Sequence, residues 1–360
     1  MQEPEVVIAG FGDERSYDAD THLNFLGERD IPISARFFSF DEARTKQTML
    51  ENLSEKEFKE ITKKLKEEKI IKHIAEASSD ELKRYKELMQ KYRVTAWDIG
   101  SAVGKQYLGE SDSSTELAAK LNGTINAAHA LGTKRIRIFN FYPGTKEQLA
   151  NPGTESFNEY RTGALKYIKE IGKRFQDEGL FGFLEVETNL IGRDGKSLVE
   201  FLDEAKVGNI FLYFDGANMV VQDTNKEGLS WKTYSEMANS PYLGGLHIKD
   251  AKYSEANEKK VDEEAHWPFV PVGKGNADYD LVFANLADKS AEKIKDIEKR
   301  LLNAGLLKEF GLVLEPHLLC GGQFGGYTGG RYQEAIDALV ELLTKAGIRY
   351  AQSEGQLNFG

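Results

Sequence analysis

Four apolar runs in the second half of the chain each end at a side chain that can bind a metal ion or transfer a proton. The runs are Phe183-Leu-Glu185, Phe211-Leu-Tyr-Phe-Asp215, Leu243-Gly-Gly-Leu-His247 and Gly311-Leu-Val-Leu-Glu315. In a parallel α/β fold, the carboxyl ends of the strands and the loops that follow them form the active-site face. One such side chain alone is more often a loop cap or an ion-pair partner, but four in succession predict a shared site.

Three carboxylates and one imidazole make an oxygen-rich set of ligands. Such a set suits Mn²⁺ or Mg²⁺, with Co²⁺ or Zn²⁺ as alternatives, better than a sulfur-rich structural zinc site would. We therefore predict one divalent metal ion held by Glu185, Asp215, His247 and Glu315. Glu187 lies two residues after Glu185 and can point in the same direction along a strand, so it is the alternative ligand there.

The elements that must position these residues follow a regular alternation. Eight strand-like apolar runs alternate with helical segments along the 360 residues. This alternation predicts a parallel sheet, and eight units favour a closed barrel over an open doubly wound sheet. The first run, Val6–Phe11, is not followed by G-x-G-x-x-G, so a dinucleotide-binding fold has little support. The predicted fold class is α/β, a single (β/α)₈ TIM barrel domain over residues 1–360.

A charged, helix-forming stretch, residues 40–92, interrupts the alternation between the second and third predicted strands. Within it, Leu82, Tyr85 and Met89 recur at helical spacing, which predicts an apolar helix face. We therefore expect extra helices between strands 2 and 3 that pack on the outside of the barrel, and not a linker or a separate domain.

Composition excludes several classes of partner. The formal net charge is −11, from 47 basic and 58 acidic residues, so a nucleic-acid backbone is a poor partner. The N-terminus lacks the basic and apolar regions of a signal peptide, and no apolar run approaches the roughly 20 residues of a membrane span. A lone Cys320 excludes an internal disulfide. We expect a cytoplasmic protein that binds neither membrane nor nucleic acid, and the sequence leaves a homo-oligomer open.

Several short motifs follow one another along nearly the whole chain outside residues 40–92. They are Gly10-Phe-Gly-Asp-Glu14, Ile99-Gly-Ser-Ala-Val-Gly-Lys105, Ile136-Arg-Ile-Phe-Asn-Phe-Tyr142, Glu185-Val-Glu187, Phe214-Asp-Gly-Ala-Asn218, His247-Ile-Lys-Asp250, Val272-Gly-Lys-Gly275 and Glu315-Pro-His317. With these motifs the sequence resembles the xylose isomerase-like TIM barrels of the sugar phosphate isomerase/epimerase family, which includes tagatose 3-epimerase-like enzymes. The order and number of the motifs carry the resemblance, and they do not identify a substrate.

The resemblance implies roles for the residues at the strand ends. In that family the metal is held by Glu, Asp, His and Glu from strands 5 to 8, which correspond to Glu185, Asp215, His247 and Glu315. The thirty-residue step from Glu185 to Asp215 fits the family spacing and favours Glu185 as the ligand. Glu187 then becomes either a residue that supports the ligands from behind or a substrate contact. The resemblance also implies that Glu185 and Glu315 form the catalytic acid/base pair.

Further side chains are candidates for contact with a small sugar substrate. They are Arg137, Asn218, Lys249, His317 and Trp267. For Arg137 the alternative is an ion pair inside the barrel, and for Trp267 it is the anchoring of a long loop. Lys105 is more consistent with the solvated rim. The glycine-rich segment 321–330 has the flexibility expected of a moving lid.

These groups predict proton transfer next to a carbonyl. A divalent ion that chelates a ketose would acidify the C–H next to the carbonyl. One carboxylate then removes that proton to give an enediolate, and a second carboxylate can return a proton to the same carbon. The predicted function is a metal-dependent sugar or keto-sugar isomerase or epimerase of carbohydrate metabolism, with manganese a favoured ion. The alternative is a lyase or dehydratase on a keto-sugar or keto-inositol. A nuclease is disfavoured by only six histidines and the net charge of −11, and a non-catalytic sugar-binding barrel by the full set of ligand candidates.

Overall fold

The computed structural model describes residues 6–49, 55–223, 227–253, 269–288, 290, 292–306, 309–318 and 331–351. Within these residues, eight parallel strands form a closed barrel, in which each strand pairs with the next and the last pairs with the first. In chain order the barrel strands are β1 (Val6–Phe11), β2 (Ile33–Ala35), β5 (Ala96–Ile99), β6 (Arg135–Ile138), β7 (Phe181–Glu185), β8 (Ile210–Asp215), β9 (Leu243–Ile248) and β12 (Phe310–Leu314). The predicted α/β barrel is thus confirmed.

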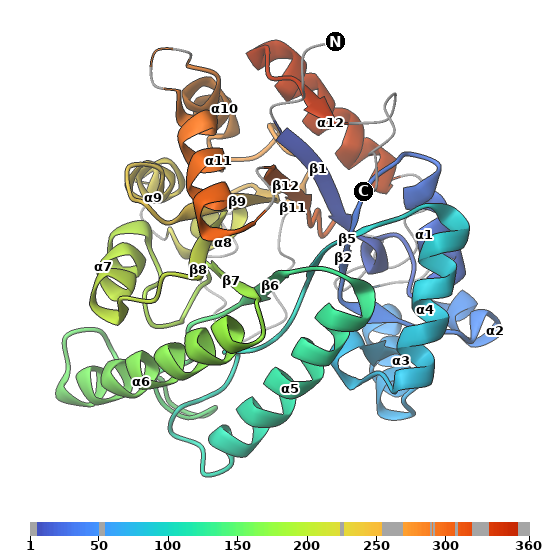
Figure 1. Ribbon diagram of the computed structural model, residues 1–360, viewed down its shortest axis with the longest axis horizontal. Coiled ribbons are helices and arrows are strands. Elements are labelled where there is room, and N and C mark those ends of the chain that lie inside the picture. The colour runs from blue at the N-terminus through green and yellow to red at the C-terminus, as the bar shows by residue number, and fades with distance from the viewer. Residues whose placement is uncertain are drawn as a thin grey trace.

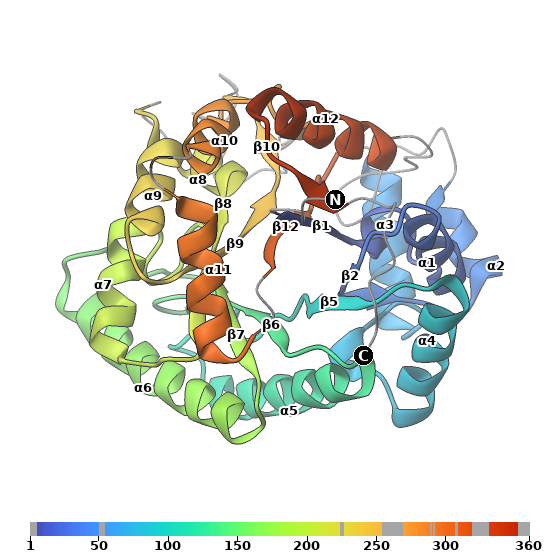
Figure 2. The same cartoon turned by 45° about the horizontal axis from the view of Figure 1, so that its top comes forward.

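Helices surround this barrel in the views of Figures 1 and 2. They are α1 (Ala19–Gly27), α4 (Ser79–Tyr92), α5 (Ser113–Leu131), α6 (Glu155–Asp177), α7 (Gly195–Ala205), α8 (Gly216–Gln222), α9 (Leu229–Ala238), α10 (Tyr279–Ala287), α11 (Lys293–Ala304) and α12 (Arg331–Ala346). Each long helix buries one apolar face, as α6 does with Ile168, Ile171 and Phe175. In the described part of the chain, every helix is too short or too polar to cross a membrane.

The segment between β2 and β5 forms extra structure outside the barrel, as predicted. It contains β3 (Phe37–Phe38), α2 (Glu42–Thr45), the 3₁₀ helix η2 (Lys46–Met49), α3 (Glu55–Glu67), β4 (Lys72–His73) and the 3₁₀ helix η3 (Ile74–Glu76), followed by α4. Helix α3 contributes Phe58 and Leu65 to a small apolar cluster with Tyr17, next to the main core. Helix α4 contributes Leu82 and Tyr85 to the main core itself. The segment between β2 and β5 therefore packs against the barrel. The assignment of residues 1–360 to one domain stays a prediction.

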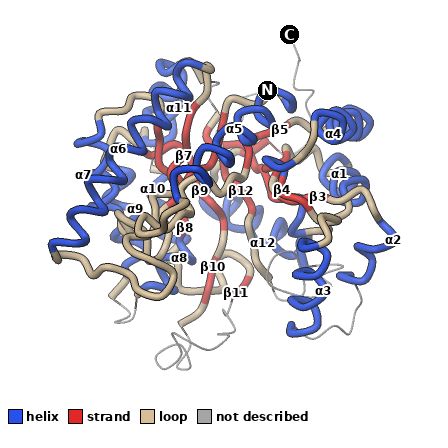
Figure 3. The backbone as a smooth tube through the Cα atoms, turned by 90° about the horizontal axis from the view of Figure 1, so that it is seen from below, coloured by secondary structure: helices blue, strands red, loops and turns tan. Residues whose placement is uncertain are grey.

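Short elements complete the two ends of the barrel. They are the 3₁₀ helix η1 (Gly12–Glu14) after β1, the antiparallel pair β10 (Asp250–Ala251) and β11 (Phe269–Val270), and β13 (Tyr350–Ala351), which pairs with β1. The β10–β11 pair lies beyond the end of the barrel in Figure 3. The carboxylate of Asp250 accepts hydrogen bonds from the backbone N–H groups of Gly273, Gly275 and Ala277 at 2.9–3.0 Å. These bonds fix the chain after β11 against the end of β9.

Replacing Gly104 by alanine is expected to destabilise the loop after β5 more than the matched change at Gly132. Both glycines have positive φ, +89° and +82°, which costs an L-residue about 1–2 kcal/mol. A Cβ at Gly104 would also lie 1.9 Å from the carbonyl oxygen of Phe139, whereas a Cβ at Gly132 would have no atom of the described residues within 4 Å. We expect Gly104→Ala to cost about 3 kcal/mol, near the upper end for single substitutions, and Gly132→Ala to cost only the strain. Urea unfolding of both variants measures this, and equal losses would contradict the close approach.

Candidate metal centre

The four residues predicted at the strand ends converge on one point inside the carboxyl end of the barrel. Glu185 and Asp215 are the last residues of β7 and β8, His247 lies near the end of β9, and Glu315 directly follows β12. Asp215 and His247 are paired across neighbouring strands. One ligand atom from each of the four lies within 4.8 Å of the others, and all four residues are buried. The closed barrel therefore gathers side chains that lie up to 130 residues apart in the sequence.

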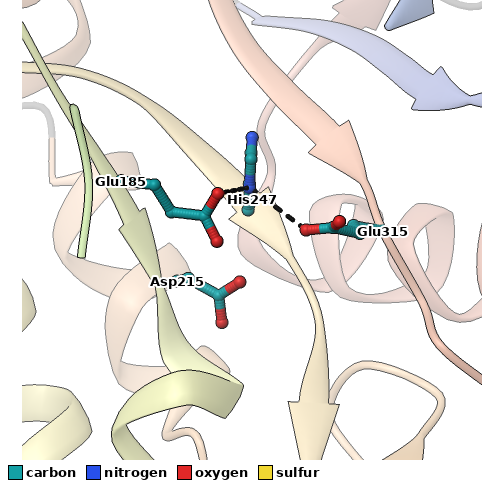
Figure 4. A group of neighbouring side chains, drawn as sticks. All are labelled: Glu185, Asp215, His247 and Glu315. Carbon is teal, nitrogen blue, oxygen red and sulfur yellow. Dashed lines mark ion pairs between the residues drawn. The ribbon is translucent and has the colours of Figure 1, made fainter. Parts of the chain in front are cut away.

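The two glutamates reach His247 from either side, with Asp215 close to both (Figure 4). Nδ1 of His247 lies 3.2 Å from Oε2 of Glu185 and 3.3 Å from Oε2 of Glu315. These distances suit ion pairs. Among the residues that the structure describes, the atoms Glu185 Oε2, Glu315 Oε2 and Asp215 Oδ2 have no hydrogen-bond partner.

Buried polar atoms without a hydrogen bond lower the stability of the fold, so several of them at one place require an explanation. Here three carboxylate oxygens without a hydrogen bond and the ring of His247 face one another. Ion pairs with Arg137 and Lys249 offset part of their negative charge, and a shared divalent cation would satisfy the ligand atoms together. The remaining oxygens already have donors. Oε1 of Glu185 accepts from Nδ2 of Asn218 at 3.1 Å, and Oδ1 of Asp215 accepts from the backbone N–H of Asn218 at 2.9 Å. The residues present therefore fit a divalent ion, which one oxygen of each carboxylate and the imidazole of His247 would hold.

Burial and neighbouring charges set the protonation of the cluster. Burial raises the pKa of Glu185, but the charges of His247 and Arg137 outweigh it and lower that pKa to about 2. Burial raises the pKa of Asp215 to about 7, despite the ammonium group of Lys249. Burial lowers the pKa of His247, but the two neighbouring glutamates outweigh it and raise that pKa to about 9. Without a metal ion, the imidazole thus carries a proton at neutral pH.

The affinity of this site for Mn²⁺ is expected to rise with pH. An imidazole ligand must be neutral, so below pH 9 metal binding has to displace the proton from His247. The dissociation constant should fall by up to about tenfold per pH unit between about pH 7 and about pH 9. The dependence should be steeper below about pH 7, where Asp215 also holds a proton. Calorimetric titration with Mn²⁺ across this range measures it, and a pH-independent affinity would contradict His247 as a ligand.

A cavity of about 330 Å³ opens onto the cluster. Glu185 and Glu315 line it, together with the candidate substrate contacts Glu187, Arg137, Asn218, Lys249 and His317. Phe37, Phe139 and Phe269 provide apolar wall. The remaining candidate, Trp267, lies outside the described residues, as does the segment 321–330.

The candidate contacts are tied to the cluster by ion pairs. Nη1 of Arg137 lies 3.3 Å from both Oε2 of Glu185 and Oε1 of Glu315, so the internal ion pair forms and the residue lines the cavity as well. Nζ of Lys249 lies 2.9 Å from Oδ2 of Asp215. These two cations offset the negative charge of the carboxylates.

The strand β7 places its two glutamates in different surroundings. Glu185 faces His247, whereas Oε2 of Glu187 accepts a hydrogen bond from Nζ of Lys105 at 2.9 Å. Lys105 is partly exposed and lines the cavity. It therefore lies closer to the site than expected from the sequence, which favoured a position on the solvated rim. Of the two, Glu185 joins the cluster found among the described residues, and its role as the metal ligand stays a prediction.

Sequence reasoning assigned no role to Arg36, Asp13 and Glu14, which the structure places beside the cluster. The Arg36 guanidinium contacts Asp13, Glu14 and Glu315. Oε1 of Glu14 in turn lies 2.9 Å from Nδ1 of His317. The available signals in the sequence were an arginine within the mostly apolar run Ile33-Ser-Ala-Arg36-Phe-Phe38, and two acidic residues, Asp13 and Glu14, just after the first strand.

The fold and the cluster define a (β/α)₈ barrel with a candidate metal centre at the carboxyl ends of its last four strands. Residues 50–309 match the family model for xylose isomerase-like TIM barrels. The chain belongs to this family. No protein of curated function matches the sequence significantly.

Solved structures with low sequence identity share the fold. A zinc-bound IolI protein has a TM-score of 0.59 and 14% identity, over 95% of this chain and 99% of that one. The D-allulose 3-epimerase from Methylomonas sp. has a TM-score of 0.53 and 15% identity, over 96% and 99%. The probable 3-DHS dehydratase AsbF from Bacillus anthracis has a TM-score of 0.51 and 14% identity, over 73% and 82%. At these identities the similarity is evidence of the fold alone.

Proposed function

We propose that this protein is a metal-dependent isomerase or epimerase that acts on a small sugar or keto-sugar by proton transfer at the carbon next to the carbonyl. The observation that carries the proposal is the convergence of buried ligand atoms from Glu185, Asp215, His247 and Glu315, next to a cavity that Glu185 and Glu315 line. Membership of the xylose isomerase-like family supports the same class of reaction. A bound Mn²⁺ or Mg²⁺ would polarise the substrate carbonyl and acidify the neighbouring C–H.

The chain's own carboxylates supply the proton transfer in this proposal. Glu185 and Glu315 lie on either side of His247 and both line the cavity (Figure 4). A substrate bound between them would have one carboxylate on each face, so that one removes a proton and the other returns it. Oε1 of Glu185 is held by Asn218, which fixes the direction of that carboxylate.

The cavity walls suit a small polar ligand. Glu187, His317 and Asn218 line the cavity and offer hydrogen-bonding groups, and three phenylalanine side chains provide apolar wall that would shield the reacting atoms from water. Arg137 and Lys249 lie beside the carboxylates. In the proposal they compensate the negative charge that develops on the substrate oxygens when a proton is removed.

Exchange of deuterium tests the proposed reaction. The Mn²⁺-loaded protein is incubated in D₂O with a panel of ketoses, and the recovered sugars are analysed by NMR and mass spectrometry. We expect deuterium at the carbon next to the carbonyl of one sugar, together with its epimer or isomer. A dehydrated product would instead identify the alternative, a lyase or dehydratase. Binding without either exchange or product would exclude both reactions and leave a sugar-binding protein.

A further inference from the structure

A second group of metal-ligand residues lies next to the first and shares Glu315 with it. It consists of Glu14, Glu315 and His317, whose ligand atoms also lie within 4.8 Å of one another, and all three are buried. The two groups divide the carboxylate of Glu315 between them. Oε2 faces His247 in the first group, whereas Oε1 faces the second, 3.8 Å from Nε2 of His317. This is how a carboxylate bridges two cations in a two-metal site.

A guanidinium already lies within the second group. Arg36, which directly follows β2, is buried, and its Nη2 lies 2.6 Å from Oε1 of Glu14 and 2.9 Å from Oδ2 of Asp13. Its Nη1 donates to Oε1 of Glu315, and its Cζ lies 4.3 Å from the ring centroid of Phe11. Three carboxylates and an aromatic face therefore fix the position of a single permanent cation.

The two carboxylate oxygens of Glu315 have different neighbours, and this orients the carboxylate in the first group. Oε1 accepts hydrogen bonds from both Arg36 and Arg137, while Oε2 accepts none from the residues that the structure describes. Because a carboxylate is rigid and planar, fixing Oε1 also fixes the direction of Oε2. Guanidinium donors in a fork hold such a geometry better than a single ammonium group does.

We propose that Arg36 is a built-in cation that takes the place of a second divalent ion and thereby positions Glu315 for the first. This inference rests on the proposed metal site but not on the proposed reaction. It predicts that the protein binds one divalent ion per chain, although two groups of ligand residues adjoin. It also assigns Asp13 and Glu14 the role of holding Arg36.

Metal binding to the wild-type protein and to Arg36→Lys tests the proposal. Mn²⁺ is titrated by calorimetry, and the bound ion is counted by elemental analysis. The wild type should bind one Mn²⁺ per chain. Arg36→Lys keeps the charge but loses the fork, and it should bind Mn²⁺ about 10–100-fold more weakly, as is typical when a residue behind a metal ligand is changed. Arg135→Lys is the matched control, because Arg135 is also a buried arginine, stacked on Trp97 at the start of β6.

Urea unfolding of the metal-free proteins shows whether Arg36→Lys folds. If it does not fold, a second variant tests the proposal. Asp13→Asn weakens the hold on Arg36 without touching Glu315, and it should weaken Mn²⁺ binding in the same direction by a smaller factor. Two Mn²⁺ per wild-type chain would overturn the proposal, as would wild-type affinity in the folded variants. Loss of all Mn²⁺ binding from the wild type would instead remove the metal site itself. The deuterium exchange experiment remains a separate test of the reaction.

Discussion

Glu315→Gln is expected to lower turnover by about 10²–10⁴-fold even when Mn²⁺ saturates the protein, the range typical for loss of a general acid or base. Glutamine keeps the shape of glutamate but has one acceptor oxygen and one donor NH₂ group. Arg36 and Arg137 both donate to Oε1 of Glu315, so they should select the amide oxygen for that position. The NH₂ group would then replace Oε2, the atom that faces His247.

The same substitution should weaken Mn²⁺ binding, because an amide NH₂ group is not a metal ligand. Turnover therefore has to be measured at saturating Mn²⁺, with occupancy determined in the same sample. Glu309→Gln is the matched control, since Glu309 directly precedes β12 at the opposite end of the barrel. It should leave turnover and Mn²⁺ affinity unchanged. Normal turnover of Glu315→Gln at full occupancy would leave Glu315 as a ligand only, and the proton acceptor would have to be Glu185, Glu187 or His317.

The barrel and the cluster were predictable because both depend on local patterns. The strand β8 is buried along its whole length and is apolar up to its last residue. That residue, Asp215, carries the first carboxylate and therefore marks the strand end in the sequence. Parallel strands bring all such ends to one face, and that topological rule alone gathers Asp215, His247 and Glu315. The choice between Glu185 and Glu187 needed family spacing, because both are acidic and lie two residues apart.

The residues behind the cluster were not predictable in the same way. Arg36 and Glu315 lie 279 positions apart, and no local pattern indicates that an arginine after β2 meets a glutamate after β12. The sequence also did not predict helix α8, which begins directly after β8. Asp215 is the last residue of the strand and also the N-cap of the helix, where its side chain accepts a hydrogen bond from the backbone N–H of Asn218. A strand that passes directly into a helix leaves no loop residues to mark the boundary.

The two glutamates of β7 should respond to the same substitution in different ways. Glu185→Gln removes a charged oxygen that faces His247 and Arg137, so we expect Mn²⁺ affinity to fall by about 10–100-fold, by analogy with changes around metal ligands. Because Glu185 is also the proposed partner of Glu315 in proton transfer, kcat at saturating Mn²⁺ should fall by about 10²–10⁴-fold.

Glu187→Gln is the matched comparison, since Glu187 bonds Lys105 and lies in the cavity wall outside the cluster. We expect its Mn²⁺ affinity to be unchanged, its KM for the sugar to rise, and its kcat to fall by less than about tenfold, as for a residue that contributes mainly to substrate binding. Calorimetry and steady-state kinetics on both variants separate the two roles. If Glu187→Gln lost Mn²⁺ binding and Glu185→Gln kept it, the ligand on this strand would be Glu187, and Glu185 would become the substrate contact.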